Sequence, residues 1–101
     1  MEKWIHKIRR LSWNQLRALR VLSKNPKGII EAEEAEKEVG LKGKALGGVF
    51  SSLARQRVGG ENLIEAWGRA AKSRSLRWKL NERAISRLRL KEVIEEVLKY
   101  E

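Results

Sequence analysis

Hydrophobic residues recur at helical spacing over the first part of the chain. Within residues 1–11, Trp4 and Ile8 predict a short helix or an ordered arm. A longer helix is predicted to start at Ser12, because Gln15 three positions later completes a capping box. The residues expected on the apolar side of this helix and its cap are Leu11, Trp13, Leu16, Leu19 and Leu22.

Glycine and proline residues divide the following stretch into short elements. The segment 25–28 ends the first long helix, because Pro26 lacks a backbone donor. Residues 28–30 are too few for an independent strand but enough to pair with one. A second helix is predicted over residues 31–39, where early glutamates suit the positive end of the helix dipole, and Gly40 ends it.

A third helix is predicted over residues 44–57, between the tight connection at 40–43 and the break at Gly59-Gly60. At about 100° per residue, its large apolar side chains fall in one arc that must face the core. They are Leu46, Val49, Phe50 and Leu53. The opposite face is small or basic, without an acid, and consists of Lys44, Gly48, Ser51 and Arg55, with Ala45 and Ser52 at its edge.

Such a face suits a helix that enters a DNA groove. Short side chains allow the helix backbone to approach, and basic side chains meet phosphates or guanine edges. The alternative interpretation is that Gly47-Gly48 marks close packing against another helix and that the bases are solvated.

After Gly60 the spacing of apolar residues changes to two. Residues 62–67 and 75–80 predict two strands. The second strand places apolar residues on one face and bases on the other, with Leu76, Trp78 and Leu80 opposed to Arg77 and Lys79. Between the strands, residues 68–74 predict a basic hairpin tip.

The C-terminal fifth predicts a helix capped by Asn81. Its apolar residues change phase between Leu88 and Leu90, which indicates a kink or two short helices. The stripe from Leu90 to Leu98 is expected to fold back on the first long helix, and the alternative is a dimer seam.

Apolar periodicity assigns three of the four tryptophans to the core: Trp13, Trp67 and Trp78. Trp4 lies among basic residues, where core packing is favoured over contact with a nucleic acid or a partner.

The composition excludes several classes of protein. The chain has 101 residues, the length of one domain, and contains no Cys, Asp or Thr. A disulfide, a thiolate zinc site and a cysteine nucleophile are therefore excluded, and His6 is the single histidine. We expect no enzyme, no metal and no cofactor, because no carboxylate or histidine cluster is visible. No apolar run approaches the ~20 residues of a membrane span, so a cytoplasmic protein is expected, and the abundance of Glu, Lys and Arg is typical of heat-adapted proteins.

Charge points to the class of partner. Lys and Arg number 23 against 13 acids, which gives a net charge of +10. The basic excess lies in residues 1–30 and 41–81, whereas residues 31–40 carry five glutamates and 82–101 are balanced. A polyanion is the expected partner, with nucleic acid ahead of an anionic membrane surface.

The order of elements resembles the winged helix-turn-helix family of DNA-binding domains. The resemblance covers residues 12–81, with 40–43 as the turn, 44–57 as the recognition helix, and 62–68 with 75–80 as the wing. It implies one mainly α domain with a small β-hairpin: a three-helix core, the wing and a C-terminal helix.

The resemblance implies binding of double-stranded DNA, with the recognition helix in the major groove and the tip 69–74 on the adjacent backbone or minor groove. The residues expected to contact DNA are Lys42, Lys44, Ser51, Ser52, Arg55, Arg57, Arg69, Lys72 and Arg74. The expected role is that of a small transcriptional regulator or a chromosome-associated protein of the nucleoid.

Two other functions stay open. The loop 40–43 has the Gly-X-X-Gly pattern of KH domains, which predicts RNA binding, although a KH fold needs a strand where residues 12–24 predict a helix. The second function is that of a winged-helix adaptor that binds only protein, and the acidic segment 31–39 favours it. If the chain forms a homodimer, the expected interface is that segment or the C-terminal helix.

Overall fold

Two helices open the described part of the chain, which is residues 4–100 of a computed structural model: α1 (Trp4–Arg9) and α2 (Trp13–Lys24). Residues 1–3 of the predicted arm lie outside the described residues. The predicted capping box is confirmed, because Ser12 Oγ accepts from the Gln15 N–H at 3.2 Å and Gln15 Oε1 accepts from the Ser12 N–H at 2.9 Å.

The segment after α2 is less regular than the sequence predicted. A three-residue strand, β1 (Ile29–Glu31), runs directly into a 3-10 helix, η1 (Ala32–Ala35), and then into the single turn of α3 (Glu36–Val39). The prediction of one continuous helix over 31–39 is wrong. Glu31 belongs to the strand, and its N–H donates to the Glu34 carboxylate at 2.6 Å, which tightens the turn that follows.

The third helix is shifted from its predicted bounds. It is α4 (Gly43–Ala54), so it ends three residues before the predicted end at Arg57. The chain then forms a small hairpin from β2 (Arg57–Val58) and β3 (Glu61–Asn62). Both glycines of its turn, Gly59-Gly60, have positive φ, which is the backbone geometry of the tightest hairpin turns.

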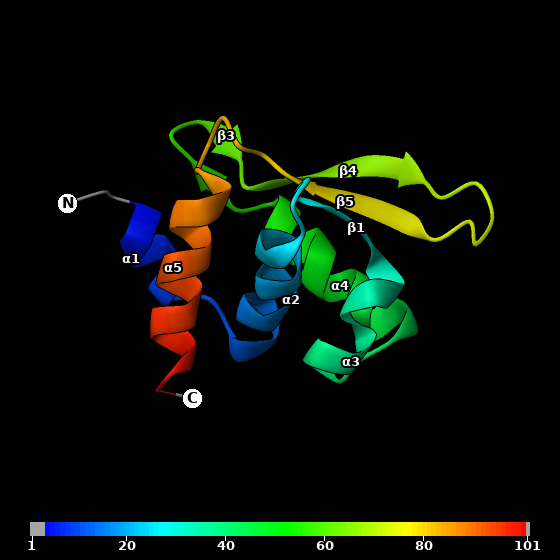
Figure 1. Ribbon diagram of the computed structural model, residues 1–101, viewed down its shortest axis with the longest axis horizontal. Helices are drawn as coiled ribbons and strands as arrows, with labels where there is room; N and C mark the ends of the chain where they lie inside the picture. Colours follow the sequence, from blue (N-terminus) through cyan, green and yellow to red (C-terminus); the bar gives the residue numbers. More distant parts are fainter. Residues whose placement is uncertain (1–3, 101) are drawn as a thin grey trace.

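A three-stranded antiparallel sheet follows, with the order β1-β5-β4. Its other strands are β4 (Ile64–Arg69) and β5 (Leu76–Leu80), close to the two predicted strands. The strand expected at residues 28–30 is β1, which lies one residue later and pairs with β5. Figure 1 shows the helices on one side of this sheet and the β4–β5 hairpin extending beyond them.

The C-terminal helix is α5 (Arg87–Leu98), and it begins later than predicted. Ser86 caps it instead of Asn81, whose amide donates to the backbone oxygen of Asn62 at 2.9 Å. The predicted kink is wrong as well, because α5 is continuous through Leu88 and Leu88 is simply 61% exposed.

α5 folds back onto the rest of the chain, as expected. Its apolar stripe is buried: Leu90, Val93, Ile94 and Leu98. Figure 1 shows α5 beside α1 and α2. Arg20 of α2 joins three helices: it donates to the Glu95 carboxylate of α5 at 2.9 and 3.1 Å and forms an ion pair with Glu38 of α3 at 3.1 Å. The hydrogen bonds and charge of Glu95 raise the pKa of Arg20, against the opposing effect of burial.

The tryptophans divide evenly between core and surface. Trp4 and Trp78 are buried, as predicted, but Trp13 and Trp67 are 43% and 41% exposed, so their assignment to the core is wrong. Trp13 lies at the first turn of α2, about 60° around the helix from Leu16 and outside the buried arc. Trp67 is one position out of phase with the residues of β4 that share a face with Trp78.

The result is a mainly helical fold with a small antiparallel sheet. No helix within residues 4–100 combines the length and the apolar composition needed to cross a bilayer.

Candidate nucleic-acid interface

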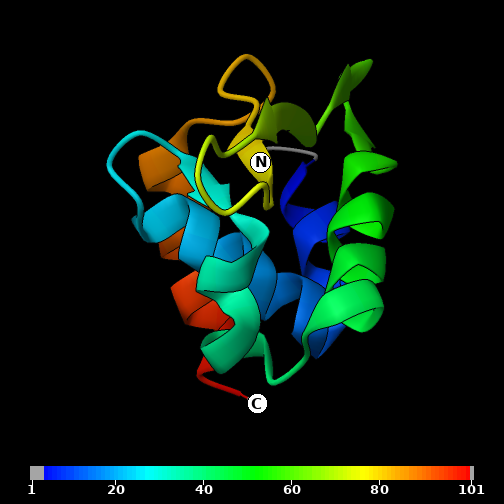
Figure 2. The same cartoon turned by 90° about the vertical axis from the view of Figure 1, so that its right-hand side faces the viewer.

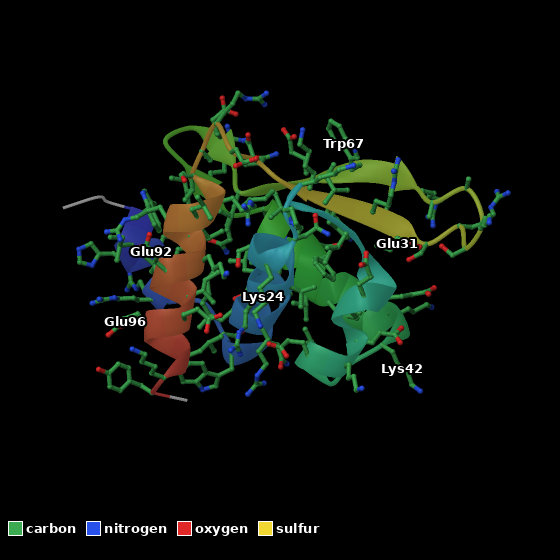
Figure 3. The ribbon with its side chains drawn as sticks, viewed as in Figure 1. Lys24, Glu31, Lys42, Trp67, Glu92 and Glu96 are labelled. Carbon is green, nitrogen blue, oxygen red and sulfur yellow. The ribbon has the colours of Figure 1, made fainter. Side chains whose placement is uncertain are left out.

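The surface of α4 carries the small and basic side chains that the sequence placed there. Lys44, Gly48, Ser51 and Arg55 are all exposed, on the side of the helix opposite the buried Leu46, Phe50 and Leu53. The first turn of α4 contains no acid, and among the described residues no side chain caps its backbone N–H groups. Lys42, at the N-cap position, is exposed at the free edge of the α3–α4 loop (Figure 3).

Two glycines in the middle of α4 have no packing role inside the protein. A Cβ atom built on Gly47 or on Gly48 would meet no atom within 4 Å. The alternative that these glycines mark close helix packing is therefore wrong. A glycine inside a helix is about 1 kcal/mol less favourable than alanine, so the pair lowers stability without an internal compensation. What it leaves is a strip of backbone that an external surface can approach.

The tip of the β4–β5 hairpin presents three exposed bases, Arg69, Lys72 and Arg74. The tip is held by its own hydrogen bonds: the Ala70 N–H donates to the Ser75 oxygen at 2.9 Å, and Arg69 Nη1 donates to the Arg74 oxygen at 3.0 Å. Arg74 has a φ of 61°, the left-handed conformation that reverses the chain here. In Figure 2, which looks toward the tip, α4 lies to one side of the hairpin and α3 lies below its tip.

A β-bulge sets the direction in which Arg69 points. Ala66 pairs with Trp78 and Arg69 pairs with Leu76, so β4 advances three residues where β5 advances two. Side chains directly opposite one another share a face of the sheet. Arg69 therefore lies on the face of Leu76 and Trp78, toward the helices. The positive φ of Gly68, 78°, accommodates the extra residue.

Ser52 and Arg57 are less available than the sequence predicted. Ser52 Oγ accepts from Gln15 Nε2 at 2.9 Å and donates to the Val49 oxygen at 2.7 Å, so this hydroxyl joins α4 to α2. Arg57 lies on β2, outside the helix, and its guanidinium donates to Asn62 Oδ1 at 3.1 Å and to the Gly60 oxygen. The backbone oxygen of Arg57 also accepts from Lys7 Nζ.

The five glutamates of residues 31–39 do not form a purely solvated face. Three of them have partners within the chain: Glu31 accepts from Ser73 Oγ at the hairpin tip, Glu34 accepts from the Glu31 N–H, and Glu38 forms an ion pair with Arg20. The other two, Glu33 and Glu36, line a groove of about 250 Å³. η1 and α3, α4 and β5 enclose this groove, with Gly43, Gly47, Leu46, Leu76 and Trp78 among its lining residues.

A second exposed feature was missed because the sequence placed it in the core. Trp67 lies on the outer face of the sheet, and Lys79 Nζ is 4.1 Å from the centroid of its ring. The strict alternation of β5 already indicates that Lys79 faces away from Trp78. The same alternation in β4, counted from the buried Ile64, gives the outward direction of Trp67.

The described residues contain no group of three or more His, Cys, Asp or Glu side chains placed to hold a metal ion. The chain matches no protein-family model, no curated protein and no solved structure.

Proposed function

We propose that this chain binds double-stranded DNA as a winged helix-turn-helix domain, with α4 in the major groove and the tip of the β4–β5 hairpin on the adjacent backbone or minor groove. The observation that carries the proposal is the exposed face of α4, which is basic, acid-free and reduced to backbone at Gly47-Gly48. The order α2, β1, η1 with α3, α4 and the β4–β5 hairpin supports the resemblance on which the proposal rests.

Phosphate contacts are expected at both ends of this surface. At the start of α4, the uncapped N–H groups and Lys42 suit an anion, because a helix N-terminus carries partial positive charge. At the hairpin, Arg69, Lys72 and Arg74 supply further cations. Much of the binding free energy therefore comes from neutralised phosphates and released counterions, so affinity falls steeply with salt.

Few side chains of α4 can read bases. Ser52 is engaged with Gln15, which leaves Lys44, Ser51 and Arg55 as the polar groups of the exposed face. A small set of this kind suits a regulator with a short recognition sequence or a sequence-tolerant, chromosome-associated protein. The expected location is the cytoplasm, on the nucleoid or chromosome.

The two acidic side chains at the groove should lower the affinity for duplex DNA of any sequence. Glu33 and Glu36 lie beside α4 and β5, where a phosphate of the approaching duplex would be repelled. A dimer through α5 would have no apolar seam, because the apolar stripe of this helix is buried within the chain. A dimer through the acidic segment stays a prediction.

The experiment is a titration of the protein with random-sequence duplex DNA and with a structured RNA hairpin at two salt concentrations. We expect tighter binding to the duplex and a strong loss at the higher salt. The double variant Lys44→Gln, Arg55→Gln should lose duplex binding. The matched control Lys91→Gln, Arg89→Gln removes two charges from α5 and should keep most of it.

Three results would overturn the proposal. Tighter binding to the RNA hairpin would favour the KH-like alternative. No binding to either nucleic acid would favour the adaptor. Equal losses for the α4 and α5 double variants would show that total charge, and not the face of α4, determines binding.

A further inference from the structure

An exposed tryptophan stands on the side of the sheet that no helix covers. Trp67 is 41% exposed, and Figure 3 shows it on the side of β4 away from the helices. The indole is held against β5, because Lys79 Nζ lies 4.1 Å from the ring centroid. The outer face thus offers a large aromatic surface in a fixed place.

The acidic side chains near Trp67 have partners within the chain, whereas the neighbouring basic side chains pair with no carboxylate among the described residues. Glu65 is paired with Arg83 at 3.3 Å, and Glu31 accepts from Ser73. Within residues 4–100, neither Arg77 nor Lys79 is paired with a carboxylate. Glu65 is therefore neutralised by Arg83, and Lys79 beside the indole is available to an anion; Arg77 has no carboxylate within ion-pair distance in the described part of the chain, although Glu31 lies opposite it in the register.

Arg77 extends the basic surface along the strand. Its Nη2 lies 3.6 Å from the position that a Cβ of Gly68 would take, so the guanidinium sits over the bulge next to Trp67. Its Nε is buried and has no hydrogen-bond partner among the described residues. Arg77 and Lys79 are two positions apart on β5 and share the outer face with Trp67.

We propose that this outer face binds single-stranded DNA, with an unpaired base stacked on Trp67 and the neighbouring phosphates on Lys79 and Arg77. An indole face stacks on any base, and adjacent cations follow the backbone; these are the two components of sequence-tolerant single-strand sites. A duplex cannot use this site in the same way, because its bases are stacked on one another. The choice of DNA over RNA rests on the proposed function of α4.

The test compares a short oligothymidylate with an abasic strand of the same length and charge, by fluorescence anisotropy at low salt. The wild type should bind the oligothymidylate more tightly. Trp67→Ala should weaken that binding about 5-fold to 150-fold and leave binding of the abasic strand unchanged. Trp67→Phe should keep most of the affinity, and Lys79→Gln should weaken binding of both strands.

Trp13→Ala is the matched control, since Trp13 is equally exposed but lies on α2. The proposal fails if Trp67→Ala binds the oligothymidylate as the wild type does, or if Trp13→Ala loses as much. It also fails if the abasic strand binds as tightly as the oligothymidylate, or if oligouridylate binds more tightly than either. Duplex binding separates the two sites: Trp67→Ala should keep it, and Lys44→Gln, Arg55→Gln should lose it while still binding the oligothymidylate.

Discussion

Phe50 of α4 stacks on Trp78 of β5, with ring centroids 5.6 Å apart and ring planes 9° from parallel. Phe50 is fully buried and Trp78 is 5% exposed. The pair links the helix that we propose to enter the major groove to the hairpin that we propose to lie beside it. The relative orientation of α4 and the hairpin thus depends on a contact in the core.

Phe50→Ala should lower the free energy of unfolding by about 3–5 kcal/mol, because it removes a fully buried ring and leaves a cavity against Trp78. Phe50→Leu should cost less, since it keeps most of the buried volume. Chemical denaturation followed by circular dichroism measures both. A loss under about 1 kcal/mol for Phe50→Ala would show that this contact is not part of the stable core.

Gly48→Ala should have opposite effects on stability and on binding. Nothing lies within 4 Å of the added Cβ, so the variant should gain about 1 kcal/mol from its higher helix propensity. The same Cβ keeps a duplex away from the helix backbone, so affinity for DNA should fall, and Gly48→Leu should lower it further. Thermal melts and duplex titrations on the same preparations measure the two effects. Unchanged DNA affinity in both variants would mean that no partner approaches the backbone here.

Arg55→Ala and Lys72→Ala should affect DNA binding in different ways. Arg55 is exposed at the end of α4, and Arg55→Ala should cost about 1–3 kcal/mol on a preferred sequence and relax the preference at one base pair. Lys72→Ala should weaken binding to every sequence similarly and lower the salt slope by about 1. Lys91→Ala on α5 removes the same charge and serves as the control. Binding selections on randomised duplexes measure the preference, and equal losses on all sequences for Arg55→Ala would argue against base reading there.

Removal of the acids at the groove should strengthen DNA binding. Glu33→Gln and Glu36→Gln should each increase duplex affinity by about 0.2–1 kcal/mol at low salt, because each removes a charge that repels phosphate beside α4. The gain should shrink at high salt, as expected for exposed charges. Glu92→Gln on α5 is the control and should change little. Weaker binding of the Glu33 or Glu36 variants would indicate that these carboxylates accept hydrogen bonds from bases.

Local signals in the sequence were sufficient to predict α2 and the two faces of β5. The Ser12 cap needs only Gln15 three residues away, and both hydrogen bonds of the box are present. The alternation of Leu76, Trp78 and Leu80 with bases likewise predicted the two faces of β5. Each of these features is decided by neighbours in sequence or by a single buried face.

Tertiary contacts decided the features that the sequence could not predict. Asn81 and Ser86 each accept a hydrogen bond from a following backbone N–H, but only a turn follows Asn81, whose amide nitrogen is bound to Asn62 across the chain, and α5 begins after Ser86. The β2–β3 hairpin has two-residue strands, which are too short to show a period. The sequence predicted a Ser52 hydroxyl free to contact DNA, but this hydroxyl accepts from Gln15, a residue 37 positions away.

The bulge in β4 has a consequence for how the length of this hairpin can vary. Deletion of Gly68 would remove the bulge and leave Arg69 opposite Leu76, on the same face of the sheet as before. Two residues added to the tip would lengthen the finger without changing the side on which any strand residue projects. The pairing of Arg69 with Leu76, and not the number of residues in β4, determines the side on which this arginine projects, so the finger tolerates the loss of one residue at the bulge as well as two added at the tip.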